Sequence, residues 1–412
     1  MQAVEPLKIT IEGDFWDCQI YKGYLYLWGM DGSLIGLDWE KLIDEFLRAN
    51  NYTIAIKYAF QDSDHLYRER LTRTQYANFK QELLQELKKV NKNFLISPKK
   101  WQNFVYSSQD NPFQELQTDT EIHYDQIFAA TDIGLLKAVT NPEFPELVSN
   151  KVENVLDYPI LSVRASKRRL ALSGGEAGVF EVNLNSDSIN SNFSSIISDG
   201  NAPRIIKAGV YQVSSKHSSF ANWSFSSIYS SSYIKNSYLL AFDWDSNSDV
   251  QGSMRTYEFR RSISQSEIFN EPGLSWGLQE KIYKSSKGKL DIIHYKQKDI
   301  GKQDYQNNFR QLGSFELDKI NGNVVTGGVA LFGVVIECDN SLIVIQSDGS
   351  LYNIAGAVTR WRVYPRSKRY LNHLHVIHDD RLEIYSFNHD YFVQQKNKKL
   401  GIKYDAHSLE SG

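Results

Sequence analysis

Short segments in which apolar and polar residues alternate recur along the chain, each followed by a turn and a second such segment. The clearest is LYLWGMDGSLIGL at residues 25–37, where Asp31 and the glycine after it separate two alternating runs. The segment LIVIQSDGSLYNI at residues 342–354 has the same arrangement, with Asp348 at its turn. Alternation with period two predicts half-buried β-strands, and an Asp-Gly pair between two of them predicts a β-hairpin.

Five further segments follow the same pattern less closely, at residues 126–139, 169–182, 238–259, 281–296 and 381–394. The turns near residues 132 and 176 are about 44 residues apart, which is the period of one four-stranded propeller blade. The count of hairpins therefore predicts an all-β fold, a β-propeller of about seven blades.

In period and hairpin pattern the chain resembles β-propellers of the WD40 type, without the Gly-His and Trp-Asp signatures of that family at matching places. The resemblance implies a single propeller domain over residues 1–405, followed by a polar tail at residues 406–412. A blade has two apolar faces that only neighbouring blades can cover, which favours a closed ring. A β-sandwich or several small β domains are the alternatives.

A helical insertion is predicted at residues 40–119, where the blade pattern is interrupted. Within TQYANFKQELLQELKKVN at residues 74–91, Tyr76 and Phe79 begin an apolar stripe with three- and four-residue spacing, which predicts an amphipathic helix. The stripe either packs on the flank of the propeller or forms a surface that docks a partner. Two further elements are predicted before it, a helix at residues 40–50 and an alternating strand at residues 52–60.

The blade pattern is interrupted a second time, by a region rich in serine and asparagine. Residues 184–203 are typical of a long polar loop. In residues 214–237, aromatic residues alternate with serines, so that Trp223, Phe225 and Tyr229 could share one strand face. Such a segment is either an adaptable partner-binding surface or a half-buried strand with small residues on its outer side.

Composition limits the classes of function. The chain has 412 residues, of which 41% are hydrophobic, so it can bury a large core. A formal net charge of -3 gives no overall attraction to nucleic acid or an anionic membrane. No apolar stretch of membrane-spanning length and no targeting pattern is present, which predicts a cytoplasmic protein with no membrane contact. Cys18 and Cys338 belong to no metal or redox motif, so we expect buried or half-buried thiols in a reducing compartment.

The sequence contains no recognisable catalytic motif. Phosphate-binding glycine loops and the G-x-S-x-G elbow are absent, so no cofactor, catalytic residue or small-molecule substrate is predicted. Four aspartates are assigned to turns, where Asp is an ordinary choice: Asp31, Asp132, Asp348 and Asp390. Carboxylates from different blades could still meet in space, which leaves an enzyme of the glycosidase kind as an alternative.

A histidine-rich strand, HLHVIHDD at residues 373–380, is the sharpest metal-like feature. On a strand His373 and His375 share a face, and two imidazoles so placed can reach one divalent ion. Because the spacing supplies no third ligand, no metal site is predicted. The alternative is a pair of polar positions on a blade strand.

The segment RWRVYPRSKRY at residues 360–370 combines cations with aromatic rings and has no acidic residue. Alternation predicts that Arg360, Arg362 and Tyr364 form an outer face while Trp361 points into the blade stack. A basic strand with aromatic neighbours suits phosphate or an acidic peptide. The alternative is that these basic residues are ordinary solvent-exposed loop residues without a binding role.

These observations favour a non-catalytic module that binds a protein or peptide within a larger assembly. The candidate binding residues are Arg360, Arg362, Tyr364, Arg366, Lys368, Arg369, Tyr76, Phe79 and Trp223. Two alternatives remain: a propeller enzyme that acts on a sugar-like substrate through convergent carboxylates, and a nucleic-acid or phosphate sensor that uses a basic rim.

Overall fold

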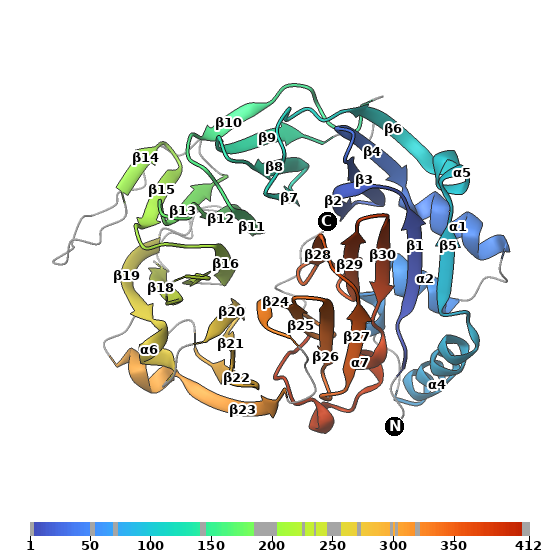
Figure 1. Ribbon diagram of the computed structural model, residues 1–412. Helices are drawn as coiled ribbons and strands as arrows, with labels where there is room; N and C mark the ends of the chain where they lie inside the picture. Colours follow the sequence, from blue (N-terminus) through green and yellow to red (C-terminus); the bar gives the residue numbers. More distant parts are fainter. Residues whose placement is uncertain are drawn as a thin grey trace. The chain divides into compact units, whose positions relative to one another are not determined.

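The described part of the chain folds into seven β-sheets, five with four strands and two with five (Figure 1). Within each sheet, antiparallel pairing of successive strands dominates. These sheets are the blades of a seven-bladed β-propeller, which confirms the predicted fold class. The computed structural model describes residues 4–49, 54–68, 73–140, 146–184, 204–224, 227–234, 236–244, 257–269, 273–296, 300, 304–317 and 322–405.

The chain divides into two compact units. Unit 1 comprises Met1–Gln114, Thr140–Asn150 and Asn321–Gly412, and unit 2 comprises Glu115–Val139 and Lys151–Ile320. The predicted polar tail at 406–412, the greater part of the predicted loop at 184–203, and Phe225 lie outside the described residues.

Unit 1 contains three blades. One consists of β2 (Phe15–Tyr21), β3 (Tyr24–Gly29), β4 (Ser33–Asp38) and β6 (Val105–Asp110). The next consists of β24 (Val324–Ala330), β25 (Gly333–Cys338), β26 (Ser341–Gln346) and β27 (Leu351–Ala355). The third is made by β28 (Arg360–Val363), β29 (His373–His378), β30 (Arg381–Ser386), β1 (Leu7–Glu12) and β5 (Asn93–Ile96).

The third blade joins the two ends of the chain. Strand β1 pairs antiparallel with β30, from Leu7 opposite Ser386 to Glu12 opposite Arg381, and parallel with β5 on its other edge. Leu7, Ile9 and Ile11 are buried on one face of β1, as the alternation LKITIE requires. The N-terminal strand therefore completes the last blade and holds it closed.

Between β4 and β6 the chain inserts α1 (Trp39–Ala49), α2 (Ile54–Phe60), α3 (His65–Arg68), α4 (Arg73–Lys89), β5, α5 (Pro98–Trp101) and a 3-10 turn at Gln102–Phe104. Helix α4 confirms the predicted amphipathic helix, and α1 confirms the shorter one. The insertion was predicted at 40–119, but β6 begins at Val105, so the inserted elements end before the last strand of the same blade.

The predicted strand at residues 52–60 is wrong, because Ile54–Phe60 forms helix α2. Its buried residues are Ala55, Ile56, Ala59 and Phe60, which also fit one face of a helix. In so short a segment, alternation and helical spacing select overlapping positions, and contact with the core decides between them.

The predicted hairpin at residues 381–394 is also wrong. Strand β30 is followed by α7 (His389–Phe392), and a 3-10 turn lies at Gln395–Asn397. Asp390, expected at a hairpin turn, is instead buried and accepts bonds from Lys398 Nζ at 2.7 Å and Tyr67 Oη at 3.2 Å.

The two Asp-Gly-Ser turns behave as the sequence predicted. Asp31 Oδ1 accepts bonds from the backbone N–H and the hydroxyl of Ser33, at 3.0 and 2.6 Å. Asp348 makes the same two contacts with Ser350, at 3.0 and 2.7 Å. Burial alone would raise the pKa of Asp348, but the bonds from His389 and Ser350 outweigh it and lower the pKa to about 2. Both aspartates are turn residues.

Unit 2 contains four blades, with strands in the following order. The first has β7 (Asp119–His123), β8 (Gln126–Ala130), β9 (Leu135–Val139) and β10 (Glu153–Leu156). The second has β11 (Ser162–Ser166), β12 (Arg169–Ser173), β13 (Val179–Asn183), β15 (Val210–Ser214) and β14 (Arg204–Lys207). The third has β16 (Phe220–Ser224), β17 (Ser227–Ser231), β18 (Tyr238–Trp244) and β19 (Tyr257–Ser264), followed by α6 (Gln265–Ile268). The fourth has β20 (Leu274–Leu278), β21 (Lys281–Ser286), β22 (Lys289–His294) and β23 (Arg310–Glu316), with a 3-10 turn at Tyr305–Asn308 before β23.

Hydroxyl side chains tie neighbouring blades of unit 2 together. In each case a Ser or Thr donates to a backbone carbonyl that lies 42 to 46 residues later, about one blade further along the chain. The three bonds are Thr118 to Ile160 at 2.6 Å, Ser173 to Ser219 at 2.8 Å and Ser231 to Ser275 at 2.5 Å. Part of the serine content of this region is therefore explained by blade packing.

Both cysteines are buried and free of disulfides, as expected. Burial raises the pKa of the Cys18 thiol well above its usual range. None of the described helices is long and apolar enough to cross a membrane.

A buried carboxylate in unit 2 predicts a pH-dependent stability. Glu181 on β13 is fully buried, and Arg169 Nε lies 3.7 Å from its Oε1. Burial raises the pKa of Glu181 to about 7, although the Arg169 guanidinium opposes this shift. Between pH 4.5 and 7 the folded chain holds a proton that the unfolded chain releases, so stability falls as the pH rises through this window.

We therefore expect Glu181→Gln to raise the free energy of unfolding at pH 8 by about 2–3 kcal/mol and to flatten its pH dependence between pH 4.5 and 7. Urea denaturation across this pH range measures both effects. Glu176→Gln, which changes an exposed carboxylate before the same strand, is the control and should leave the slope unchanged. A pH slope that is equally steep in Glu181→Gln would contradict the assignment.

Candidate partner-binding surfaces

The basic strand β28 does not present an outer face. Arg362 is 6% exposed, and its Nε and Nη2 atoms donate to the two oxygens of buried Asp17 on β2, at 2.7 and 2.6 Å. The predicted outward orientation of Arg362 is therefore wrong. In a propeller both faces of a blade pack against other blades, so alternation along β28 assigns each side chain to one of two packed faces.

The neighbours of Arg362 confirm this arrangement. Arg360 Nη1 lies 3.4 Å from Asp17 Oδ2, and its guanidinium stands 5.2 Å from the ring of Trp16. On the opposite face, the indole of Trp361 donates to Glu337 at 2.7 Å. The same indole lies over Gly328 of β24, where an added Cβ would meet it at 2.7 Å.

The histidine pair on β29 shares a face, as predicted, but its nitrogens serve a buried hydrogen-bond chain. His373 Nε2 contacts the carbonyl of Ala59 at 3.0 Å, and its Nδ1 lies 3.4 Å from His375 Nε2. His375 Nδ1 is 3.1 Å from Tyr364 Oη. Burial lowers the pKa of His373 to about 3 and that of His375 well below its usual range, so both rings are neutral. The described residues contain no group of three or more His, Cys, Asp or Glu arranged for a metal ion.

Unit 1 brings together the basic segment and the helical insertion, two regions that the sequence predicted separately. The backbone N–H groups of Ser63 and Asp64 donate to the carbonyls of Arg369 and Lys368, at 3.1 and 3.0 Å. The Arg369 guanidinium pairs with Glu40 and lies 3.9 Å from Asp62. Arg369 thus joins this segment to α1 and to the turn after α2. Tyr364, Arg366 and Lys368 are half-buried, and their role in partner binding stays a prediction.

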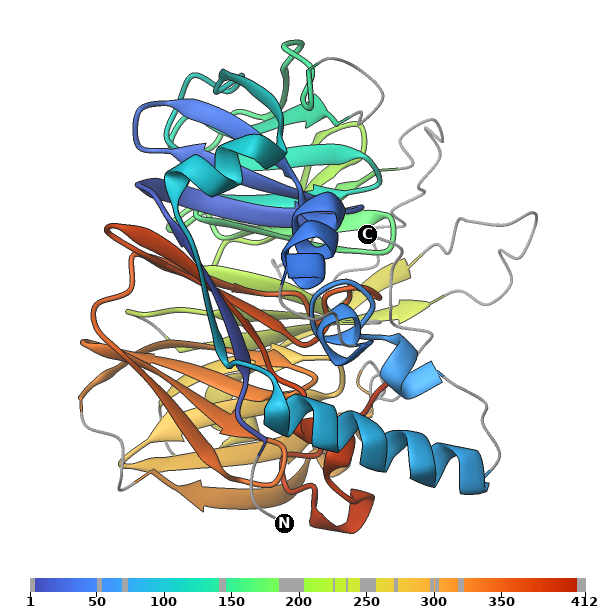
Figure 2. The same ribbon diagram turned by 90° about the vertical axis from the view of Figure 1, so that its right-hand side faces the viewer.

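Helix α4 packs its apolar stripe on unit 1. Tyr76 meets Tyr391 of α7 at a ring distance of 6.1 Å, and Phe79 meets Tyr58 at 5.9 Å. Figure 2 shows α4 running across this flank beside the C-terminal segment that contains α7. Both Tyr76 and Phe79 are half-buried, so the first of the two alternatives for this helix describes its packing. Partner docking by the remaining surface stays a prediction.

Trp223 is a core residue of unit 2. Its side chain is 2% exposed and packs at 5.4 Å from the ring of Phe242. The expectation that this ring reaches the surface is therefore wrong. Tyr229, expected on the same face, is also buried, and its hydroxyl bonds to Ser275 Oγ at 2.6 Å.

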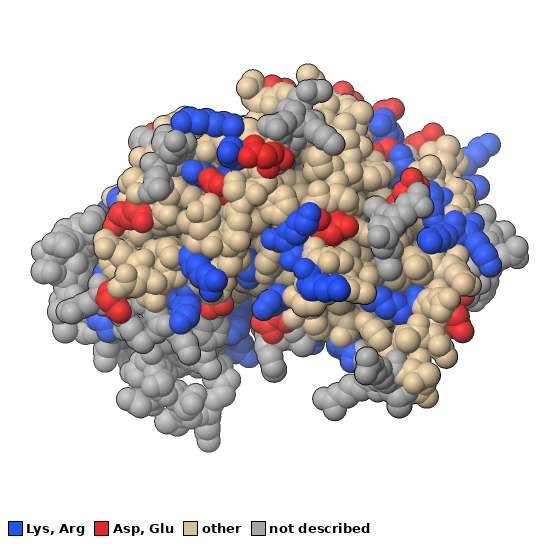
Figure 3. Space-filling view, turned by 90° about the horizontal axis from the view of Figure 1, so that it is seen from below, with Lys and Arg blue, Asp and Glu red and all other residues tan. Residues whose placement is uncertain are grey.

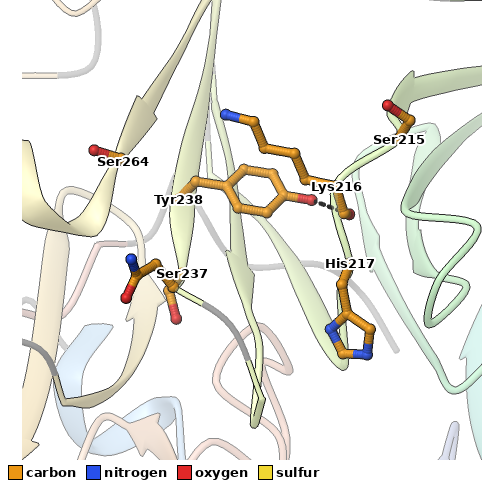
Figure 4. Close-up of a pocket in the computed structure, with 7 residues that line it drawn as sticks. Ser215, Lys216, His217, Ser237, Tyr238 and Ser264 are labelled. Atoms are coloured by element: carbon orange, nitrogen blue, oxygen red, sulfur yellow. Dashed lines mark hydrogen bonds between the residues drawn. The ribbon is translucent and has the colours of Figure 1, made fainter.

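Other residues of the same serine-rich segment line a pocket of about 420 Å³ in unit 2 (Figure 4). One wall is the loop from β15 to β16, with Ser215, Lys216 and His217, and the other comes from β18 and the end of β19. The Tyr238 hydroxyl donates to the Lys216 carbonyl at 2.7 Å, and the Lys216 ammonium stands 5.5 Å from the Tyr238 ring. The remaining lining residues are Asn236, Ser237 and Ser264.

Exposed apolar side chains accompany this pocket on the connections of three consecutive blades. Tyr233 and Ile234, 56% and 68% exposed, lie in the β17–β18 connection, with Ile234 two residues before its first pocket residue, Asn236. Leu161 before β11 and Ile133 between β8 and β9 are 42% and 52% exposed. We call these four residues and the pocket the unit 2 rim.

Hydrogen bonds show that the rim residues lie on one continuous edge of unit 2. The N–H of Ile160 donates to Thr131, and the N–H of Leu161 donates to Ser173. The next turn is joined to the pocket loop by a pair of bonds between Gly175 and Ser218, both at 3.0 Å. The last link runs from the Tyr233 N–H to Ser219 Oγ at 3.2 Å.

Sequence reasoning selected the segment that forms the pocket but chose the wrong side chain in it. A signal was available in SSSYIKNS, where two bulky apolar residues follow the alternating run and therefore fall at a turn. Bulky apolar residues at a turn have no neighbouring strand to cover them.

Carboxylates on the first strands of blades form ion pairs and hydrogen bonds with residues of neighbouring strands. In unit 1, Asp17 holds Arg362 and Arg360. In unit 2, Asp119 accepts a bond from the N–H of Val163 at 3.0 Å and Glu121 accepts one from the N–H of Ala165 at 3.2 Å. These contacts engage the three carboxylates in hydrogen bonds to neighbouring strands.

Surface charge is mixed on the face shown in Figure 3. Lys and Arg side chains lie among neutral and acidic ones on its described surface rather than in an unbroken basic area.

No protein-family model matches this sequence, and no curated protein matches it either. Among solved structures, the chain is similar to the β-propeller domain of Myceliophteria thermophila Cps50 (Swd1), with 8% sequence identity and a TM-score of 0.48. The similarity covers 91% of this chain and 96% of that domain. At this identity the likeness concerns the fold alone.

Proposed function

We propose that this β-propeller is a non-catalytic interaction module that binds a protein or peptide partner through the unit 2 rim. The observation that carries the proposal is the set of four exposed apolar side chains beside a polar pocket on one edge of unit 2. Exposed apolar groups gathered beside polar ones are typical of protein-binding sites, because their burial in a complex removes them from water.

Two features favour binding over catalysis. The first is that the carboxylates on the first strands of blades already accept hydrogen bonds. Asp17 accepts them from Arg362, and Asp119 and Glu121 accept them from backbone N–H groups, so these three are not free to act as an acid–base pair. The basic residues Arg362 and Arg360, which the nucleic-acid alternative would use, are bound to Asp17.

A double variant, Tyr233→Ser with Ile234→Ser, tests the proposal by affinity capture of the tagged full chain followed by quantitative mass spectrometry. The wild-type chain is expected to recover a stoichiometric partner, and the variant at least about tenfold less of it, because two anchors are lost.

The matched control is Ile205→Ser with Leu312→Ser, which removes two exposed apolar residues from the outer strands β14 and β23. This control should recover the partner like the wild type. Equal recovery by the rim variant would count against the proposal, and circular dichroism of both variants establishes that they are folded.

A further inference from the structure

We infer that the pocket of the unit 2 rim takes an acidic side chain of the partner, with an apolar side chain of the same peptide segment placed against Tyr233 and Ile234. This inference rests on the proposed function and specifies the chemistry of its ligand. It follows from the charge of the pocket lining, from the hydrogen bonds of Lys216 and from the position of the two apolar residues.

Among the described residues that line the pocket, Lys216 contributes an ammonium group and none contributes a carboxylate. The other described residues that line the pocket are serines, Asn236, Tyr238 and His217, which offer hydrogen-bonding groups. A pocket of this composition is complementary to a negatively charged group that can also accept hydrogen bonds.

The ammonium of Lys216 has donor capacity left for a ligand. It carries three protons, and one of them is donated to Ser262 Oγ at 3.1 Å. The ring of Tyr238 holds the ammonium at 5.5 Å, and the Tyr238 hydroxyl fixes the backbone of Lys216. The side chain is therefore positioned before any ligand arrives (Figure 4).

Glu267 is a carboxylate that interacts electrostatically with Lys216 and has hydrogen-bond partners of its own. Glu267 accepts bonds from the N–H and hydroxyl of Ser264, at 2.7 and 2.8 Å, and from the Tyr305 hydroxyl at 2.7 Å. Burial would raise the pKa of Glu267, but the bonds from Ser264 and Tyr305 together with Lys216 outweigh it and lower the pKa. Glu267 thus caps α6 and bonds to Tyr305, and among the described contacts it makes no hydrogen bond to the Lys216 ammonium.

The imidazole of His217 adds a second polar contact to the pocket. Its Nδ1 is bonded to Ser232 Oγ at 2.8 Å, which fixes the ring, and within the described part of the chain its Nε2 has no hydrogen-bond partner. Ser232 is followed directly by Tyr233 and Ile234 in the sequence. The apolar pair lies in the same connection as the lining residues Asn236 and Ser237, and the His217–Ser232 bond joins this connection to the pocket loop. An acidic residue beside an apolar one in a short peptide can reach both.

A library of random peptides displayed on phage, selected on the immobilised full chain, provides the test. We expect the enriched peptides to share a Glu or Asp next to an apolar residue. A synthetic peptide with the enriched sequence should bind about tenfold more tightly than its Glu→Gln or Asp→Asn counterpart, measured by fluorescence anisotropy.

Lys216→Met should bind the acidic and the amide peptide equally, whereas Lys207→Met, which removes an exposed cation from β14, should keep the wild-type preference. A preference for the acidic peptide that persists in Lys216→Met would overturn the inference, as would enrichment of peptides without an acidic residue or a selection that enriches none. In each of these cases the affinity-capture experiment with the rim variant still decides the proposed function separately.

Discussion

Replacing Arg362 with methionine is expected to lower the free energy of unfolding by about 3 kcal/mol, because it leaves the carboxylate of Asp17 buried without its bidentate partner. Asp17 is fully buried, and both of its carboxylate oxygens accept hydrogen bonds from Arg362, at 2.7 and 2.6 Å. The loss should fall near the lower end of the range for buried pairs, because Arg360 remains 3.4 Å from the same carboxylate. Urea denaturation followed by circular dichroism measures the change.

Two further variants make this result specific. Lys368→Met changes a half-buried cation of the same basic segment, and we expect a change below about 0.5 kcal/mol. Combining Arg362→Met with Asp17→Leu should cost less than the sum of the single changes, because the second substitution removes the uncompensated charge. Additive losses would show that the pair does not interact as the geometry requires.

Ile9→Asn is expected to lower the free energy of unfolding by about 4–6 kcal/mol, since it removes a fully buried aliphatic side chain and places an amide in the core. Ile9 is 1% exposed and lies in the middle of β1, between β30 and β5. Because β1 completes the last blade, the same change should make that blade more sensitive to limited proteolysis, with early cleavage in residues 373–386.

Thr10→Asn is the matched control, on the adjacent position of the same strand. Thr10 is half-buried on the other face of β1, so the substitution should cost less than about 1 kcal/mol. If both variants were equally destabilised, the effect would come from the strand backbone rather than from the buried face, and the role assigned to Ile9 would be wrong.

The candidate site was predictable in part. The segment at residues 214–237 was identified from its mixture of serines and aromatic rings, and it contains Lys216 and His217 of the pocket. The choice of Trp223 was wrong, because a tryptophan on a strand that is covered on both faces contributes to the core. Nothing in the local sequence shows whether a second blade covers a strand face.

The same limitation explains why the orientation of Arg362 in the basic segment was predicted wrongly. In an isolated sheet, alternation would place Arg362 outside and Trp361 inside. In a propeller both positions are covered, and the arginine is accommodated by an acidic residue 345 positions away in the sequence. A long-range partner of this kind leaves no trace in the pattern around Arg362 itself.

The sequence by itself determined the repeating element of this protein. Period-two alternation with turn residues at regular spacing specifies hairpins, and six of the seven predicted hairpins form, all except the one at residues 381–394. Repeated hairpins of this kind require a fold that covers both faces of each one. It also determined α4 and the two Asp-Gly-Ser turns, because their signals are local: helical spacing in one case, and an Asp that bonds two residues ahead in the other. Only the tertiary structure decided that Ile54–Phe60 is a helix, that β1 closes the last blade and that Arg362 is buried on Asp17. Each of these features depends on contacts between residues distant in sequence, and their free energy outweighs the local preference of the chain.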